Sequence, residues 1–374
     1  MSRDDVEFLA EEGPVGADDD IVEFGRRRVP RSVTTLAGLA VASVIVASLA
    51  AQRDRPTSSA HRKPAPSITA SRPAQLPPVP GLGRPLPLPT SPVVDAVVSP
   101  GRLYTLQFSQ LTLLMAGGPQ QVSPDGLDFA RIGGAVRLVL DVAANRLWIV
   151  VVNTPDGGIL EFEASTLRRL RHASWAQPIA AATTLHGVLY FSTPSGVAAF
   201  PPGAKQPAIV PALRGQTGVI VADPRRSRLL VLDYAMRSRV RAYVPGSGLS
   251  DTVGEMSFGK GTVVVTGDGE IWAGGFGNRR AVLTRLDPTS LRPAGASPLA
   301  SRLGPGAVVV AAGQSDIFVR NGSSGTQLFC VNGESGSTNQ QWSDLPGRVT
   351  SRKGESYVVS GTALRPLITR ACTG

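Results

Sequence analysis

Asn145-Arg146-Leu147-Trp148 is one copy of a short phrase that recurs along most of the chain. Each copy has a small or polar residue, a variable residue, an aliphatic residue and usually an aromatic residue. The seven copies are Gly101-Arg102-Leu103-Tyr104, Asn145-Arg146-Leu147-Trp148, Gly187-Val188-Leu189-Tyr190, Ser227-Arg228-Leu229-Leu230, Gly269-Glu270-Ile271-Trp272, Ser315-Asp316-Ile317-Phe318 and Gly354-Glu355-Ser356-Tyr357. Between their fourth residues the steps are 44, 42, 40, 42, 46 and 39 residues. The chain therefore contains a repeat of about 42 residues.

Each repeat fits a β pattern. In the second repeat, strands are predicted at Val136–Val142, Arg146–Val152 and Ile159–Glu163, with turn residues between them. The middle segment is apolar without alternation from Leu147 onward, which is typical of strands buried on both faces. The fourth repeat follows the same plan within residues 218–244. Blades that stack face to face around a ring impose this burial, and about 42 residues is the length of one four-stranded blade.

We therefore predict an all-β fold, a β-propeller that occupies residues 93–374. It has seven blades if every copy of the phrase marks one. It has six if the last copy is irregular, because Ser356 stands there in the aliphatic position. Blades use nearly all of this region, so we expect no separate catalytic domain.

Two stretches resemble known propeller repeats. The sequence from Asp223 to Asp233 resembles the blade motif of the seven-bladed superfamily that includes streptogramin-lyase-like and YVTN-type surface proteins. The sequence from Gln327 to Gly336 is similar to the strand-and-turn ending of quinoprotein-like blades. The resemblance covers residues 93–374 and implies a fold more than a function. The repeats lack the tryptophan-docking motif of quinoproteins and the Gly-His and Trp-Asp pairs of WD-repeat proteins. This argues against the quinoprotein cofactor and a WD-type scaffold.

An apolar segment near the N-terminus predicts a membrane anchor. Val33–Ala51 has 19 residues without charge or proline, enough for a helix to span a bilayer core of roughly 30 Å. We place the transmembrane helix at residues 32–52. Four arginines lie within residues 26–31, and fewer basic residues follow the segment, so the N-terminus is predicted to be cytoplasmic and the rest extracytoplasmic. The alternative is a cleaved signal peptide, although the segment is long and its N-terminal flank is acidic.

The segments on either side of this helix are predicted to be disordered. Residues 1–31 hold nine acids and five arginines, a composition typical of an acidic solvating tail; a weak docking peptide is the alternative. Residues 53–92 contain 11 prolines and are predicted to form an extended linker. A stalk through the cell envelope suits this linker better than an adaptor ligand of the P-x-x-P type.

The charge of the repeat region limits the class of partner. Residues 93–374 hold 27 bases and 18 acids, and the whole chain has a net charge of +10. A basic ring suits an anionic polymer of the envelope, a membrane surface or a membrane protein partner. Nucleic acid is not expected, because the predicted topology places the ring outside the cell. Only four of the 38 bases are lysine, which also fits an arginine-rich coding bias.

Few residues of the repeat region suit catalysis. Its only histidines, His172 and His186, are 14 residues apart, and both are expected to be polar residues at loop tips. Lyase-like propellers use paired histidines and acidic metal ligands from different blades, and no matching pair occurs here. The sequence also lacks a G-x-S-x-G motif and Asp-rich calcium loops. We predict no catalytic residue, no metal site and no cofactor.

The best binding candidate is a run of alternating arginines. Strand alternation places Arg237, Arg239 and Arg241 on one face, where three guanidinium groups span about 13 Å and suit several phosphates or carboxylates. The alternative is an outer edge strand whose charges prevent aggregation.

The two cysteines, Cys330 and Cys372, are 42 residues apart, which is one repeat. A disulfide between them is permitted outside the membrane and would fasten the end of the chain to the neighbouring blade. Equivalent positions in adjacent blades do not guarantee the short Cα separation that a disulfide needs, so two free thiols are the alternative.

These features together predict a single-pass membrane protein whose extracytoplasmic propeller is a non-catalytic binding or scaffolding module at the cell envelope. The alternative is a propeller hydrolase or lyase that acts on an extracytoplasmic substrate. Clustered acids and histidines would favour the alternative, and the sequence offers few histidines and scattered acids.

Overall fold

The structure is a computed structural model, and its described residues belong to one compact unit that begins at Gln75. It describes residues 82–86 and 93–367 with gaps at 108–109, 116–117, 123–135, 155–156, 234–237, 259, 278–279, 305–306, 322–326, 339, 344, 346–347, 353–354 and 361–362. The predicted tail, membrane helix and most of the linker lie outside these residues. In the part of the chain that is described, no helix is both long enough and apolar enough to cross a membrane.

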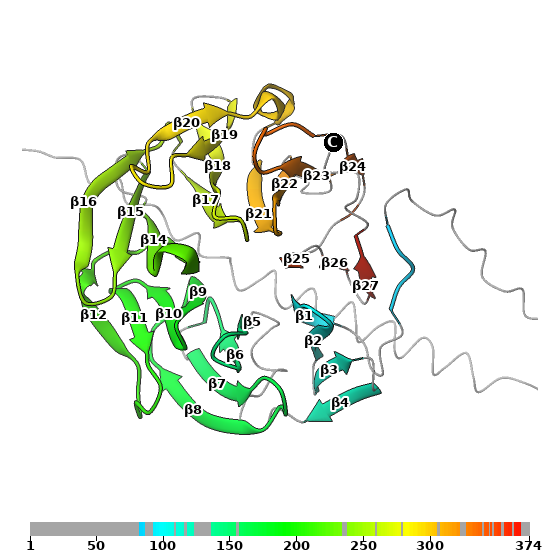
Figure 1. The fold of residues 1–374 in the computed structure, drawn as a ribbon. Helices are drawn as coiled ribbons and strands as arrows, with labels where there is room; N and C mark the ends of the chain where they lie inside the picture. Colours follow the sequence, from blue (N-terminus) through cyan, green and yellow to red (C-terminus); the bar gives the residue numbers. More distant parts are fainter. Residues whose placement is uncertain are drawn as a thin grey trace, which may run out of the picture. The chain divides into compact units, whose positions relative to one another are not determined.

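The described chain forms seven antiparallel sheets around a central channel. Figure 1 shows this arrangement viewed along the axis of the ring. Each sheet is one blade, and its first strand lies innermost. Blades 1 to 3 comprise β1 (Val93–Ser99), β2 (Arg102–Gln107), β3 (Leu111–Met115), β4 (Gly118–Val122), β5 (Val136–Asp141), β6 (Arg146–Val151), β7 (Gly157–Glu163), β8 (Arg169–Trp175), β9 (Ala181–Leu185), β10 (Val188–Thr193), β11 (Gly196–Phe200) and β12 (Ala208–Arg214).

Blades 4 to 7 continue the same plan, with two short 3₁₀ turns. They comprise β13 (Val219–Asp223), η1 (Pro224–Arg226), β14 (Arg228–Asp233), β15 (Arg239–Val244), β16 (Gly248–Glu255), β17 (Lys260–Val265), β18 (Ile271–Gly277), β19 (Arg280–Leu286), β20 (Pro293–Ala296), η2 (Pro298–Arg302), β21 (Val308–Ala312), β22 (Asp316–Asn321), β23 (Gln327–Asn332), β24 (Gln340–Trp342), β25 (Arg348–Arg352), β26 (Glu355–Ser360) and β27 (Ala363–Pro366). The seven-bladed prediction is confirmed, and the six-bladed alternative is wrong.

Blade 7 takes its outer edge from the other end of the chain. Its sheet contains only β25, β26 and β27, and Leu82 forms an antiparallel bridge with Leu367 just beyond β27. The amide of Gly83 donates to the carbonyl of Pro366 at 2.8 Å, and the amide of Leu86 donates to the carbonyl of Leu364 at 2.9 Å. Residues 82–86, which the sequence assigned to the linker, therefore act as the fourth strand of blade 7, beside β27 in Figure 1.

The first residue of the repeated phrase makes the turn from the inner strand to the second strand. Gly101, Asn145, Gly187, Ser227 and Gly269 all have positive φ angles, between 51° and 91°. Gly and Asn tolerate this left-handed conformation better than most residues, which explains why small or polar residues begin the phrase. Every copy thus marks the start of the second strand of its blade.

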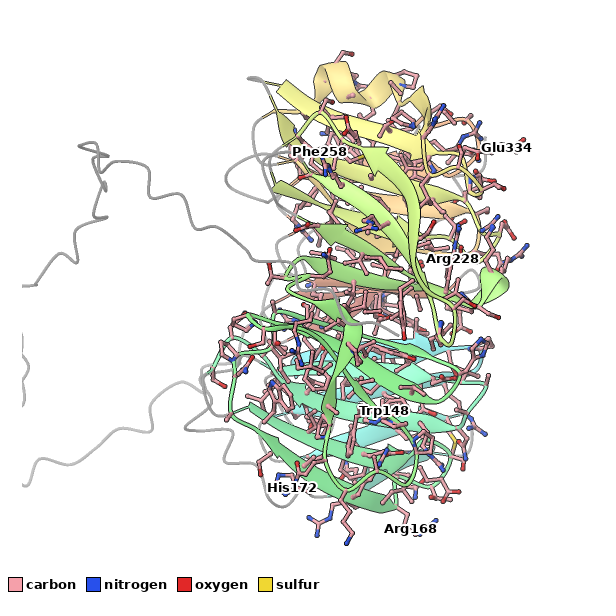
Figure 2. All side chains as sticks on the ribbon, turned by 90° about the vertical axis from the view of Figure 1, so that its left-hand side faces the viewer. Trp148, Arg168, His172, Arg228, Phe258 and Glu334 are labelled. Atoms are coloured by element: carbon pink, nitrogen blue, oxygen red, sulfur yellow. The ribbon has the colours of Figure 1, made fainter. Side chains whose placement is uncertain are left out.

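The third and fourth residues of the phrase face opposite neighbours, because side chains alternate along a strand. Leu147 packs in the buried cluster shared by blades 1 and 2, while Trp148 packs in the cluster shared by blades 2 and 3. Leu229 and Leu230 divide in the same way between the clusters of blades 3–4 and 4–5. Figure 2 shows Trp148 inside the stack of blades. An apolar pair at these positions is therefore what a blade buried on both faces requires.

Candidate ligand-binding cavity

A cavity of about 630 Å³ lies where the inner strands of blades 2 to 7 turn into their second strands. Because all six blades contribute inner-strand ends, the cavity occupies one end of the central channel. It is lined by residues within 140–143, 183–186, 222–225, 265–267 and 312–314 and by Ser351. Every one of these residues lies within the five positions that precede a copy of the repeated phrase. The positions just before each copy of the phrase therefore indicate where the cavity lies, a signal that the sequence interpretation did not use.

The carboxylate of Asp141 at this cavity joins two blades. One oxygen accepts a hydrogen bond from the amide of Ala144 at 3.0 Å, and the other accepts from the amide of Gly187 in blade 3 at 2.8 Å. The side chain is almost fully buried. A carboxylate that receives two backbone hydrogen bonds is held in one orientation. Asp141 therefore serves as a fixed strut between blades 2 and 3.

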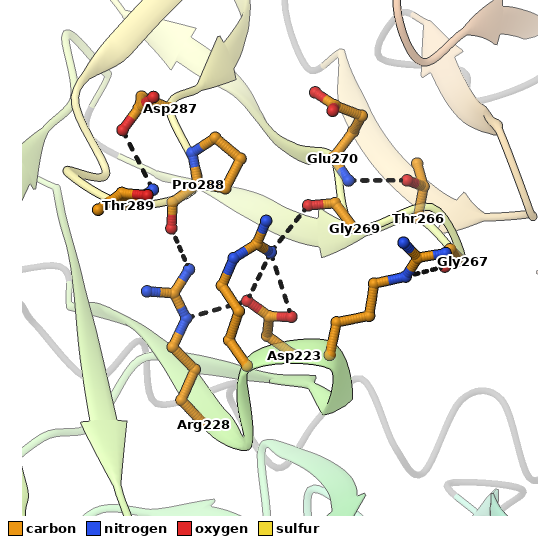
Figure 3. A network of polar contacts seen from close by, with 11 residues as sticks. Asp223, Arg228, Thr266, Gly267, Gly269, Glu270, Asp287, Pro288 and Thr289 are labelled. Carbon is orange, nitrogen blue, oxygen red and sulfur yellow. Dashed lines mark hydrogen bonds and ion pairs between the residues drawn. The ribbon is translucent and has the colours of Figure 1, made fainter.

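Asp223 is the centre of a second link, between blades 4 and 5, which Figure 3 shows. This fully buried carboxylate accepts from Arg226 at 3.1 Å and from Arg228 at 2.9 Å. Arg226 also donates to the carbonyl of Gly269 in blade 5 at 3.0 Å, and Arg228 donates to the carbonyl of Pro288. Two guanidinium groups thus link the buried carboxylate of blade 4 to backbone carbonyls of blade 5. We call Asp223, Arg225, Arg226 and Arg228 the arginine clasp.

Arg225 completes the clasp at the rim of the cavity. Its guanidinium donates to the carbonyl of Gly267 at 2.7 Å and pairs with Asp268 at 3.5 Å. Gly269 permits this approach, because a Cβ there would lie 2.9 Å from the Arg225 side chain. The sequence interpretation quoted these arginines only for their resemblance to a blade motif. Their place directly after an inner strand is the signal that would have located them at the cavity.

Backbone hydrogen bonds build the rim between blades 5 and 6. The amides of Gly267 and Asp268 donate to the carbonyls of Gly313 and Gln314, both at 2.8 Å. The Gln314 side-chain amide donates to the Asp268 carboxylate at 2.6 Å. Behind this rim, burial raises the pKa of Asp316, and the nearby charge of Asp268 raises it further. The rim is therefore rigid, with most of its charged groups already engaged.

The groups that remain for a ligand are hydroxyl, amide and imidazole groups. The Thr183 hydroxyl accepts from the amide of Ala222 at 3.2 Å, and the Thr266 hydroxyl accepts from the amide of Glu270 at 3.0 Å. Each hydroxyl keeps its own proton for a second hydrogen bond. Among the described residues, no group of three or more His, Cys, Asp or Glu side chains is arranged to hold a metal ion. The cavity therefore suits a small polar ligand that is bound by hydrogen bonds.

The alternating arginines lie on β15, the third strand of blade 4. Arg239 is exposed and pairs with Glu255 on β16 at 3.6 Å. Arg241 is half-buried and donates to the carbonyl of Ser250 from its Nε at 3.2 Å and from one Nη at 3.0 Å. Arg237 lies outside the described residues. Both described arginines share a face, as predicted, but β16 rather than β15 is the edge strand, and ligand binding at this strip stays a prediction.

The two histidines occupy different parts of blades 2 and 3. His172 lies within β8, the outermost strand of blade 2, so its assignment to a loop tip is wrong. His186 lies in the turn between β9 and β10, as expected, and lines the cavity with a φ of 51°. The outermost strand of one blade and the innermost turn of the next do not form a catalytic pair. Both side chains are exposed.

Cys330 is fully buried in β23 within the cluster shared by blades 6 and 7. Cys372 lies outside the described residues. The disulfide between them therefore stays a prediction.

Comparisons with known proteins identify the fold and no family. No protein-family model matches the chain, and no curated protein matches its sequence. Among solved structures, the RRP9 WD40 repeats match with a TM-score of 0.57 and 13% identity, over 78% of this chain and 98% of that one. A streptogramin B lyase matches with a TM-score of 0.52 and 12% identity, over 75% and 95%. Kuenenia stuttgartiensis hydrazine synthase matches with a TM-score of 0.52 and 9% identity, over 79% and 100%.

These proteins differ in name, and at such low identity the matches support the fold alone. The chain is a seven-bladed β-propeller. The resemblance to streptogramin-lyase-like propellers that the sequence between Asp223 and Asp233 suggests is thereby confirmed at the level of fold.

Proposed function

We propose that this protein is a single-pass membrane protein whose extracytoplasmic propeller is a non-catalytic binding module at the cell envelope. The anchor rests on the uncharged segment Val33–Ala51 and the arginines that precede it. The proline-rich linker then gives the ring reach from the membrane. In this topology the chain from the anchor enters the propeller through residues 82–86, at the outer edge of blade 7.

One observation carries the non-catalytic part of the proposal. Three of the acids around the central channel are engaged in holding blades together: Asp141 by two backbone amides, Asp223 by two arginines, and Asp95 by the amide of Leu138 and the side chain of Arg348. A hydrolase or lyase needs an acid or base that is free to exchange a proton with its substrate. Carboxylates fixed by strong hydrogen bonds hold the blades together, and the hydroxyl, amide and imidazole groups around the cavity are the ones that contact a ligand.

Metal content and turnover test the choice between binding and catalysis. The full-length protein is purified without chelators, its bound metal is quantified, and it is assayed against a panel of esters and lactones. We expect substoichiometric metal and no turnover above the buffer rate. Stoichiometric metal, or turnover that His186→Ala abolishes while the variant stays folded, would favour the hydrolase alternative instead.

Labelling of single introduced cysteines tests the topology. Ala17→Cys lies in the acidic tail and Ser335→Cys lies on an exposed turn of blade 6, each placed in a chain whose native cysteines are replaced by serine. A membrane-impermeant maleimide is expected to label Ser335→Cys in intact cells and Ala17→Cys only after permeabilisation. The reverse pattern contradicts the proposed orientation, and a mature protein that lacks residue 17 supports the signal-peptide alternative.

A further inference from the structure

The outer strand of blade 2 carries an excess of positive charge that no other outer strand matches. The sequence of β8 contains Arg169, Arg171 and His172, and Arg168 immediately precedes it. By contrast, β4, β20 and β24 contain no charged residue, β12 contains one arginine, and β16 contains two acids and no base. An outermost strand also presents its free edge to solvent, and Arg168, Arg169 and His172 are all exposed there.

The acids around this strand are fewer than its bases. The buried carboxylate of Glu161 is shared by Arg146 at 3.0 Å and by Arg171. Glu163 pairs with Arg168 at 3.4 Å, and the Arg168 side chain nevertheless remains 68% exposed. In residues 146–175 and the adjacent turn 201–207, the bases Arg146, Arg168, Arg169, Arg171 and Lys205 outnumber the acids Asp156, Glu161 and Glu163 by five to three, a net charge of +2.

Arg171 brings a further base to the same surface. Its guanidinium stacks 3.8 Å from the centre of the Phe200 ring and donates to the carbonyls of Pro201 at 2.9 Å and Ala204 at 2.7 Å. These bonds hold the turn after β11 against β8. Lys205 follows directly in that turn and is exposed. Arg171 thus holds the turn that carries Lys205 of blade 3 against the outer strand of blade 2.

The alternating arginines of β15, which the sequence predicts as the best binding candidate, are balanced by nearby acids. Arg239 lies directly opposite Glu255 in the register of β15 and β16, and the two side chains pair. The sequences of β14, β15 and β16 contain three bases (Arg228, Arg239 and Arg241) and three acids (Asp233, Asp251 and Glu255), a net charge of zero. In blade 4 the acidic outer strand balances the positive charge of the arginines on β15. In blade 2 the outer strand is itself basic and adds to the positive charge of the blade.

We propose that Arg168, Arg169, His172 and Lys205 form a binding surface for an anionic polymer, which we call the β8 surface. Figure 2 shows Arg168 and His172 at the outer margin of the ring. From residue 168 to residue 172 an extended chain covers about 13 Å, which matches several charged groups along a polymer. Exposed guanidinium and ammonium groups bind such a polymer with strong salt dependence, because counterions are released. The proposal deepens the proposed function by naming the chemistry of the partner.

Two matched double variants of the full-length protein test this surface. Arg168→Gln with Lys205→Gln removes two charges from the β8 surface, and Arg239→Gln with Arg292→Gln removes two charges from exposed positions on blades 4 and 5. Binding is measured by fluorescence anisotropy with labelled polygalacturonate, a polycarboxylate, and with labelled polyphosphate, at several salt concentrations. The two probes distinguish carboxylate from phosphate as the charged group.

We expect the first variant to weaken binding of at least one polymer by roughly 10-fold at low salt and to lower the salt slope by about 2, one unit per lost contact. The second variant is expected to change affinity less than about twofold, since its arginines are neutralised or distant. Both variants should melt within about 2 °C of the wild type, because exposed charges contribute little to stability.

Equal weakening by both variants would overturn the proposal, because it would show a response to net charge alone. The proposal also fails if the wild type binds neither polymer, if the first variant binds as tightly as the wild type, or if a single-stranded DNA oligomer binds more tightly than both polymers. None of these results alters the turnover and topology tests, so failure of the β8 surface and failure of the proposed function are distinguishable.

Discussion

The interface between blades 4 and 5 and the interface between blades 7 and 1 show how differently one ring can join its blades. Between blades 4 and 5, 11 buried apolar residues pack together and the arginine clasp crosses from one blade to the next. Between blades 7 and 1, the corresponding cluster has six buried residues among those described. The first interface is formed by neighbours in sequence, whereas the second must join the two ends of the chain.

Polar groups are also treated differently at the two interfaces. The face of blade 1 toward blade 7 contains Thr105, Gln107 and Thr112, whose neighbours on β2 and β3 (Tyr104, Leu106, Leu111 and Leu113) pack toward blade 2. The side-chain polar atoms of these three residues are buried and have no hydrogen-bond partner among the residues that the structure describes. Buried polar groups without partners cost about 1–3 kcal/mol each. An ion pair between the buried Asp95 of blade 1 and Arg348 of blade 7 also crosses the seam. The smaller apolar cluster and the unpartnered polar groups offset it, so we expect the seam to be weaker than the interface between blades 4 and 5.

The largest expected effect comes from breaking the clasp. Asp223→Ala leaves Arg228 buried against blade 5 without its carboxylate, and we expect the free energy of unfolding to fall by about 3–5 kcal/mol. Urea denaturation followed by tryptophan fluorescence measures this change. Asp268→Ala is the control in the same interface, because its side chain is 45% exposed and pairs with Arg225 at 3.5 Å. A control effect as large as that of Asp223→Ala would show that the clasp has no special role.

The next largest effect concerns the closing strand. A chain that begins at Gln75 keeps residues 82–86, whereas one that begins at Pro87 loses two backbone hydrogen bonds to blade 7 and the packing of Leu82 and Leu86. We expect the shorter chain to be less stable by about 2–4 kcal/mol. Thermal denaturation of the two chains gives the comparison. If the two melting temperatures coincide, residues 82–86 do not close the ring.

Two smaller changes in stability are expected to have opposite signs, one at the seam between blades 7 and 1 and one at the interface between blades 5 and 6. Thr112→Val replaces a buried hydroxyl that has no partner in the described part of the chain, and we expect it to stabilise the ring by about 1 kcal/mol. Thr262→Val removes a hydroxyl that donates to the carbonyl of Val309 in blade 6 at 2.6 Å, and we expect it to destabilise by about 1 kcal/mol. Chemical denaturation resolves both. Changes of the same sign would contradict the contrast between the interface of blades 5 and 6, where this hydroxyl has a partner, and the seam between blades 7 and 1.

The repeat predicted the fold well because a single four-residue phrase satisfies three local requirements. Its first residue makes a left-handed turn, and its third and fourth residues face opposite interfaces, as Asn145, Leu147 and Trp148 do. These requirements depend on residues close in sequence, so they recur in the sequence. The strands of the second and fourth repeats followed directly from this pattern.

Closure of the ring was not predictable in the same way. Residues 82–86 include Pro85, lie in a proline-rich segment, and pair with residues more than 270 positions later in the chain. Nothing in their local composition distinguishes them from the linker. The pairing of Arg239 with Glu255 was equally hard to predict, because it depends on how β16 returns beside β15. Pairings of this kind arise from tertiary structure rather than from local pattern.

The central claim is that the carboxylates around the channel hold the blades together instead of taking part in a reaction. Asp141→Asn tests this claim most directly, because it keeps the shape of the side chain and places an amide donor against one of the two backbone amides that Asp141 accepts. Urea denaturation of the full-length protein should show a loss of about 1–3 kcal/mol in the free energy of unfolding. Unchanged or increased stability would contradict the account, because it would leave Asp141 free for a ligand or a reaction.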